Sequence, residues 1–179
     1  GYSHGSDNEK SDISSVKEYQ RINNIKFFEK WKPVLQQDQF PNAANVFRAR
    51  DRSRKKRIIL VVDHYVPHYD QDAGSKTIFQ YLKLFVSLGF NVKFIGDNFY
   101  RHEPYTTKLQ QMGIEVLYGS WYADNWQKWI ADNGDQFDLV LLGRPHITIK
   151  YIDFIRENTR AKILYYGHDL HFVRELKQY

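Results

Sequence analysis

The sequence predicts an α/β fold, a parallel sheet of about five strands in the order 3-2-1-4-5 with helices on both faces, plus an N-terminal helical extension. From Arg57 onward, short apolar runs alternate with segments whose apolar residues recur at helical spacing. Polar loops or glycines separate them, so each strand and the following helix form one repeated unit. Residues 1–56 lack this alternation. We therefore expect two regions, a helical extension with a basic linker (1–56) and an α/β domain (57–179).

The apolar runs place the strands. The first reads IILVVD and is apolar on both faces, as buried parallel strands are. The expected strands span residues 58–63, 92–95, 114–118, 137–142 and 163–166. Helices are expected around residues 78–86, 105–112, 121–132 and 147–155, and another is expected to begin at Asp169. Gly89 should end the first of these helices in a left-handed conformation.

The extension carries one helical pattern. Val16, Tyr19 and Ile22 begin an apolar repeat of three residues that continues to Trp31. Ser14 or Ser15 is expected to cap this helix, and Lys32-Pro33 to end it, because the residue before proline avoids helical angles. Residues 36–57 show no period and predict an irregular connector.

Composition bounds the class of protein. A chain of 179 residues with 42% hydrophobic and 26% charged residues is typical of a soluble globular domain. No apolar run approaches the roughly 20 residues of a membrane span. Cysteine is absent, which excludes disulfides and thiolate metal sites and fits a cytoplasmic location.

The net charge of +5 is concentrated in Arg48–Arg57, which reads RARDRSRKKR. Two interpretations remain open. In the first, the run is a solvated linker. In the second, it contacts anionic lipid headgroups at the inner face of the membrane, or a phosphorylated acceptor. Nucleic acid is not an expected partner, because no DNA- or RNA-reading module accompanies the run.

The predicted sheet also predicts the place of the site. Ligands of open parallel sheets bind beyond the carboxyl ends of the strands, where the first and fourth strands part. Three polar segments fall there: 63–75, 143–146 and 167–171. They hold five of the seven histidines, namely His64, His68, His146, His168 and His171.

The segment Asp72-Ala73-Gly74-Ser75 lies between the first strand and its helix. Free amides at Gly74 and Ser75, with the helix dipole, favour an anion such as a diphosphate. The alternative is a plain turn at Gly74 and an N-cap at Ser75. The G-x-G-x-x-G and P-loop patterns are absent. Asp70-Gln71-Asp72 has the D-x-D spacing that can hold a divalent cation. Loop solvation or capping is the favoured explanation of this motif, and we expect no metal.

His168-Asp169-Leu170-His171 follows the fifth strand. His168 is either a hydrogen-bond partner for a sugar hydroxyl, a general base near neutral pH, or part of a helix cap. Arg144-Pro145-His146 is either a contact for an anionic group or an ordinary loop before a helix.

Three segments together resemble a known family: RIILVVDHYVPHYDQDAGSKTIFQYLKLFVSLGFNVKFI, FDLVLLGRPHI and ILYYGHDLHFVRE. They are similar to the N-terminal Rossmann-like domain of bacterial group 1 glycosyltransferases of GT-B architecture, especially those that build O-antigens, over residues 57–179. HGSDNEK with INNIKFFEKWKPVL resembles the tail of a family 2 (GT-A) glycosyltransferase domain. The alternative for this segment is a simple helical arm.

The resemblance implies transfer of a sugar, of hexosyl or rhamnosyl type, from a nucleotide-sugar to a saccharide or lipid-linked acceptor in polysaccharide biosynthesis, without metal or cofactor. It implies that Gly74 and Ser75 approach the donor diphosphate and that His168 is catalytic, facing the reacting sugar. The residues expected on the acceptor side are Tyr65, His68, Asp70 and Asp72.

The family continues beyond the point matching Tyr179 with a C-terminal domain that holds most of the donor. The resemblance therefore implies that the fragment is inactive alone. Two other interpretations remain: a non-catalytic module that organises a larger polysaccharide synthase, and a nucleotide-dependent oxidoreductase or epimerase. The missing glycine triplet argues against the second.

Overall fold

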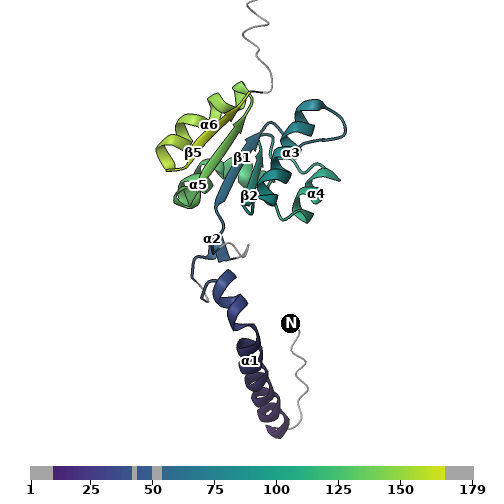
Figure 1. Cartoon of the computed structure of the whole chain (residues 1–179), viewed down its shortest axis with the longest axis vertical. Helices are drawn as coiled ribbons and strands as arrows, with labels where there is room; N and C mark the ends of the chain where they lie inside the picture. The colour runs from purple at the N-terminus through teal and green to yellow at the C-terminus, as the bar shows by residue number, and fades with distance from the viewer. Residues whose placement is uncertain (1–9, 42–43, 50–53, 168–179) are drawn as a thin grey trace, which may run out of the picture. The chain divides into compact units, whose positions relative to one another are not determined.

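The computed structural model describes residues 10–41, 44–49 and 54–167. The chain divides into two compact units, residues 1–55 and 56–179 (Figure 1). This division lies one residue from the expected boundary. The two units are described separately below.

The second unit contains the predicted sheet. All its strand pairs are parallel and the strand order is β3-β2-β1-β4-β5, which confirms the predicted fold class. The strands are β1 (Ile58–Asp63), β2 (Asn91–Gly96), β3 (Glu115–Leu117), β4 (Leu139–Gly143) and β5 (Lys162–Tyr166).

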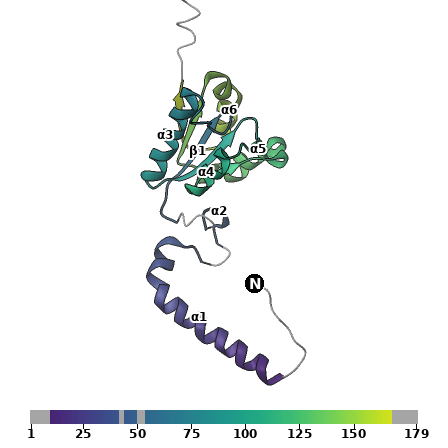
Figure 2. The same cartoon turned by 90° about the vertical axis from the view of Figure 1, so that its right-hand side faces the viewer.

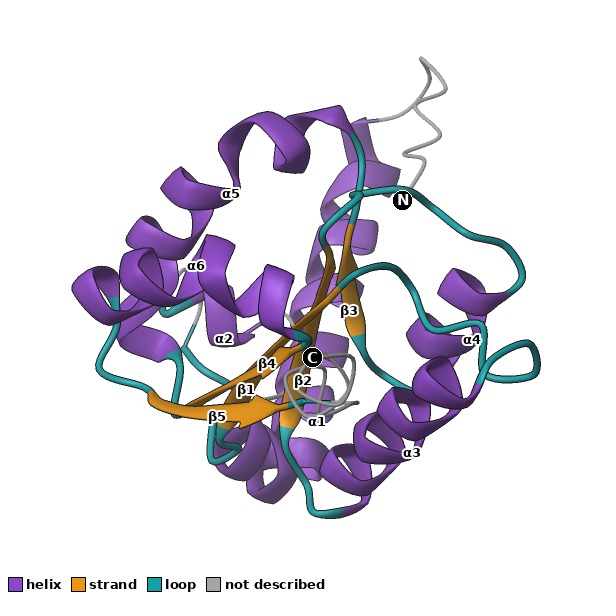
Figure 3. Cartoon of the chain, turned by 90° about the horizontal axis from the view of Figure 1, so that it is seen from above, coloured by secondary structure: helices purple, strands orange, loops and turns teal. Residues whose placement is uncertain are grey.

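Two helices cover each face of the sheet. Helices α3 (Ala73–Ser87) and α4 (Tyr105–Gln111) lie on one face, and α5 (Ser120–Asn133) and α6 (Pro145–Asn158) lie on the other (Figures 2 and 3). A short 3-10 helix, Gly134–Gln136, precedes β4. The change of face occurs where the chain returns from the β3 edge to pair β4 with β1, because right-handed crossovers in opposite directions lie on opposite faces.

The core explains the apolar pattern of the sequence. Every residue of β1 is buried, so its near-continuous apolar run is packed from both faces. On the α3 side, Ile59 and Val61 belong to one cluster with Ile78 and Leu82. Gly89 has the expected left-handed conformation, with φ of 80°.

The first unit contains α1 (Lys10–Asp38) and α2 (Val46–Ala49). The expected bounds of α1 were wrong at both ends, since the helix begins before Ser14 and contains Pro33. A proline removes one helical hydrogen bond and crowds the preceding turn, but the helix continues past Pro33 to Asp38. Near its end, the Arg54 guanidinium donates to the carbonyl oxygens of Gln36 (2.7 Å) and Gln39 (3.2 Å). Basic side chains stabilise helix ends in this way.

Most apolar side chains that the structure describes in α1 are exposed, among them Tyr19, Ile25 and Trp31. Three residues advance an α-helix by about 300°, so a repeat of three winds around the helix rather than along one face. Although α1 has 29 residues, no helix in the described parts of the chain has an apolar stretch sufficient to cross a bilayer.

Candidate functional site

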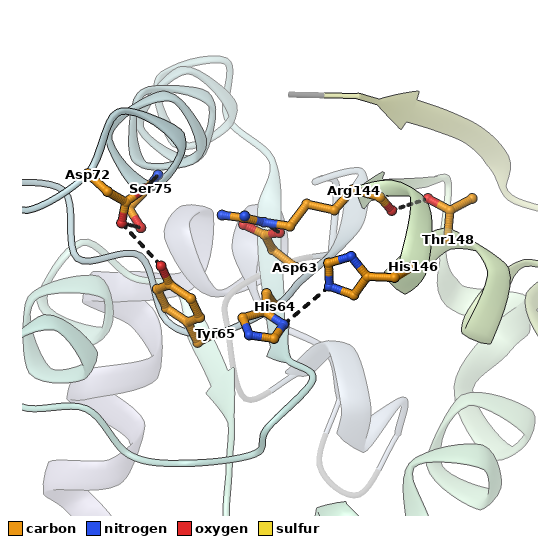
Figure 4. Close-up of polar contacts among 8 residues, drawn as sticks. All are labelled: Asp63, His64, Tyr65, Asp72, Ser75, Arg144, His146 and Thr148. Atoms are coloured by element: carbon orange, nitrogen blue, oxygen red, sulfur yellow. Dashed lines mark hydrogen bonds and ion pairs between the residues drawn. The ribbon is translucent and has the colours of Figure 1, made fainter. Parts of the chain in front are cut away.

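Polar side chains from three segments meet at the carboxyl edge of the sheet, where β1 and β4 part (Figure 4). The segments are the end of β1 with its loop, the first turn of α3, and the loop from β4 into α6. This is the place that the predicted strand order indicated.

A buried ion pair joins the ends of β1 and β4. Asp63, the last residue of β1, is 2% exposed, and Arg144 Nε donates to its Oδ1 at 2.9 Å. Gly143 makes room for this carboxylate, because a Cβ there would lie 3.0 Å from Asp63 Oδ1. The guanidinium also lies over the Tyr65 ring, 5.8 Å from its centroid. Arg144 is therefore fixed on two sides.

The backbone of Arg144 is strained. Its φ of 65° and ψ of 141° are unfavourable for a residue with a side chain. Such conformations cost about 1–3 kcal/mol and persist where surrounding contacts impose them. Here the Arg144 amide donates to Tyr166 O (3.1 Å), and the Arg144 carbonyl accepts from the Thr148 amide (3.0 Å) and hydroxyl (2.9 Å). Strain of this kind gathers at functional sites.

Asp72 caps α3. Its Oδ1 accepts from the Ser75 amide at 2.7 Å, and its Oδ2 accepts from the Ser75 hydroxyl at 2.6 Å and the Tyr65 hydroxyl at 3.2 Å. Burial raises the pKa of Asp72, but the hydrogen bonds from Ser75 and Tyr65 and the charge of Arg144 outweigh it, so the pKa lies below its ordinary value. The carboxylate therefore stays ionised and holds the first turn of α3.

This cap changes the expected role of the α3 start. The Ser75 amide already has the Asp72 carboxylate as its acceptor, and Ser75 itself is buried. Gly74 lies beside it in the first turn and is half-buried. The N-cap is Asp72, not Ser75 as the alternative interpretation had it. The free amide expected at Ser75 is absent.

The four residues expected on the acceptor side lie close together, since the Tyr65 and His68 rings are 5.1 Å apart, but their other partners differ. Tyr65 and Asp72 belong to the α3 cap described above. His68 and Asp70 instead contact Tyr105, since the Tyr105 hydroxyl donates to Asp70 Oδ1 at 2.6 Å and its ring stacks on His68 at 4.5 Å. Asp70 and Asp72 thus bind different partners, which disfavours a shared cation. Within the described residues, no group of three or more histidines and acids is placed to hold a metal ion.

His68 also contacts His102, a residue that the sequence did not single out. The His102 ring lies 4.7 Å from it, and burial together with the His68 charge lowers the pKa of His102. The neutral form of His102 is therefore favoured. His102 belongs to the loop after β2, so the contact joins that loop to the loop after β1.

A pair of histidines lies on the α6 side of the site. His64 Nδ1 and His146 Nε2 are 3.3 Å apart, and both side chains are exposed. Both residues were among the five expected at this edge, but their contact was not predicted. The available signal was the strand order, which makes the residues after strands 1 and 4 neighbours. The same reasoning applies to Asp63 and Arg144.

A carboxylate after β2 also contacts α6, the helix that carries His146. Asp97, just after β2, accepts from the Tyr151 hydroxyl at 2.8 Å and pairs with Lys150, both on α6. Burial and this carboxylate raise the pKa of Tyr151 well above its ordinary value, so the hydroxyl remains a donor. The contact fixes the middle of α6 against the loop after β2.

Two expectations cannot be placed in this site. His168, the expected catalytic residue, lies outside the described residues, as do His171 and the helix expected from Asp169. The basic run Arg48–Arg57 is described only in part, without residues 50–53. Of its described members, Arg54 binds α1 carbonyl groups, and Arg57 lies over the Phe90 ring at 5.6 Å. These two side chains have contacts within their own units.

A fold of this class hosts many unrelated activities, so function is inferred from the chemistry of the site. The groups at the edge between β1 and β4 are the Arg144 guanidinium held by Asp63, the exposed imidazoles of His64 and His146, and the Asp72 carboxylate that caps α3. No family model matches this chain, and comparison with curated proteins and with solved structures finds no similar one.

Proposed function

We propose that this chain is the Rossmann-like, N-terminal half of a GT-B glycosyltransferase that transfers a sugar from a nucleotide-sugar to a saccharide or lipid-linked acceptor. One observation carries the proposal. The ion pair Asp63–Arg144, the histidine pair His64–His146 and the Asp72 cap converge at the edge where β1 and β4 part. Open parallel sheets bind phosphate-bearing ligands at this position.

The chemistry of sugar transfer suits these groups. Negative charge develops on the leaving diphosphate, and fixed donors beside it stabilise the transition state. Imidazoles near neutral pH exchange protons with hydroxyl groups or hydrogen-bond to them. In the proposal, His168 contacts the reacting sugar, Gly74 lies near the diphosphate, and Tyr65 and Asp72 border the acceptor.

The alternative proposal is a non-catalytic module that organises a larger polysaccharide synthase. One observation favours the module. Asp70 accepts a hydrogen bond from Tyr105, and Asp72 accepts one from Ser75, so two of the carboxylates expected to bind a ligand instead hold the protein's own loops. Such a module would bind a saccharide or a partner domain without a nucleotide.

Ligand-observed NMR on the longest natural protein that carries this sequence tests donor recognition. Nucleoside diphosphates and nucleotide-sugars are compared with NAD and with free sugars. The proposal requires saturation transfer to at least one nucleotide-sugar. Transfer to NAD alone would contradict it in favour of an oxidoreductase, and transfer to free saccharides alone would favour the non-catalytic module.

Turnover is measured in the longest natural protein that carries this sequence. His168→Ala is expected to lower sugar transfer about 100-fold or more, as loss of a general base or of a hydrogen-bond partner in the transition state does. His171→Ala is the matched control, with the same residue type three positions later. Equal activity of the two variants would remove the role proposed for His168.

A further inference from the structure

The two terminal nitrogens of Arg144 have no hydrogen-bond acceptor among the described residues. An arginine has five N–H donors, and the ion pair with Asp63 uses the one on Nε. Figure 4 shows the guanidinium extending across Asp63 toward the Asp72–Ser75 start of α3. A planar edge with two parallel donors matches the geometry of a phosphate group.

The neighbouring helix start does not offer the same contact. The Asp72 carboxylate accepts from both the amide and the hydroxyl of Ser75. An anion approaching Ser75 would therefore meet an ionised carboxylate in place of a free donor. The first turn of α3 favours negative charge through its dipole, but Asp72 already supplies that charge.

The surrounding contacts hold Arg144 in a strained backbone conformation and fix the direction of its side chain. Its left-handed φ of 65° turns the side chain toward Asp63, which is buried at the end of β1. The guanidinium carbon lies over the Tyr65 ring, 5.8 Å from its centroid. A buried carboxylate on Nε and a ring beneath leave the terminal nitrogens as the accessible edge. This arrangement preorganises two donors at the switch point of the sheet.

We propose that the terminal nitrogens of Arg144 bind a phosphate group of the ligand, and that Asp63 positions them. The phosphate contact thus lies on the β4 side of the site, not at the Ser75 amide. The proposal deepens the proposed function and takes its phosphate-bearing ligand from it, but its test needs no sugar transfer. The phosphate comes either from a nucleoside diphosphate or from a phosphorylated acceptor.

Pyrophosphate is the probe, titrated at low salt into the 179-residue chain and followed by calorimetry and by the arginine Nε–H signals in NMR. The Nε–H signal that Arg144→Lys removes is assigned to Arg144, and we expect pyrophosphate to shift it. Arg144→Gln is expected to weaken binding about tenfold or more, as loss of a charged hydrogen bond does. Arg156→Gln, an exposed arginine of α6, is the matched control and should change affinity less than about twofold.

Arg144→Gln leaves Asp63 buried without its partner, so the double variant Asp63→Asn with Arg144→Gln keeps the test valid if the single variant unfolds. It should also lose binding. Asp63→Asn alone keeps the arginine charge, and here the Arg144 Nε–H signal should no longer respond to pyrophosphate. Unchanged affinity in either Arg144→Gln variant would overturn the proposal, as would the absence of pyrophosphate binding to the wild type.

Competition separates the two phosphate sources. Displacement of pyrophosphate by UDP, GDP or dTDP assigns the contact to the donor, and displacement by farnesyl phosphate or a sugar 1-phosphate assigns it to the acceptor. Either result supports the phosphate contact. Loss of pyrophosphate binding in Arg144→Gln, without any nucleotide-sugar binding to the longest natural protein that carries this sequence, would uphold this inference while contradicting the proposed function.

Discussion

The two units treat the same residue types in opposite ways. Ile78 in α3 is fully buried, whereas Ile25 in α1 is 46% exposed. In α3 the apolar residues Ile78, Leu82 and Phe85 recur at spacings of four and three, which keeps them on one face toward the sheet. In α1 the strict repeat of three shifts each apolar residue by about 60° around the helix. Spacing, more than apolar content, decides which helix a sheet can bury.

The largest expected effect lies in the sheet unit. Ile78→Ala removes a fully buried side chain from the cluster under α3, and we expect it to lower the free energy of unfolding by about 2–5 kcal/mol. Urea unfolding followed by far-UV circular dichroism measures the change. A loss below about 1 kcal/mol would mean that α3 is not packed on the sheet as described.

The sheet was predictable because its signals are local and repeated. The order β3-β2-β1-β4-β5 followed from strand and helix alternation, and a left-handed glycine marked the end of α3. The bounds of α1 were not predictable in this way. Pro33 normally indicates a helix end, but the helix continues to Asp38. Arg54, 15 residues or more away in sequence, binds one carbonyl group in its last turn and one just after it. A contact between residues so far apart leaves no local pattern.

The side-chain cap of α3 should have an intermediate effect on the free energy of unfolding. A helix stabilised by residue propensities alone would show no such effect. Asp72→Ala removes the acceptor of the Ser75 amide and hydroxyl, and we expect a loss of about 1 kcal/mol. The pKa of Asp72 is lowered in the folded chain from its ordinary 3.8. The stabilisation by the ionised group is therefore complete above about pH 3.8 and is lost as the pH falls through the lower, folded pKa.

The measurement compares urea unfolding of the wild type and of Asp72→Asn, which keeps an acceptor but no charge. Their difference should be constant near neutral pH, should shrink as the pH falls below 3.8, and should vanish below the folded pKa. A difference that grows in acid has the wrong sign for a carboxylate with a lowered pKa.

The candidate site was predicted in place but only partly in its members. The strand order located the edge between β1 and β4, and Tyr65, Asp72 and Gly74 lie there.

The sequence did not show which carboxylates are free to bind a ligand. Their freedom depends on distant partners such as Tyr105, which lies 35 residues from Asp70 in the chain. The backbone strain of Arg144 has no sequence signal either, because nothing in Gly143-Arg144-Pro145 requires the arginine to be left-handed.

The smallest expected effect on the free energy of unfolding lies in α1, where the same substitution can be compared directly with the one in α3. Ile25→Ala removes an exposed side chain and introduces a better helix former, so we expect the free energy of unfolding to change by no more than about 0.5 kcal/mol and the helical signal to stay equal or rise. The same substitution therefore has a large cost at Ile78 and almost none at Ile25. Circular dichroism at several protein concentrations measures the effect. A loss above about 1 kcal/mol that grows with concentration would show that Ile25 is buried against a second copy of the chain, since only burial makes removal of an isoleucine side chain so costly.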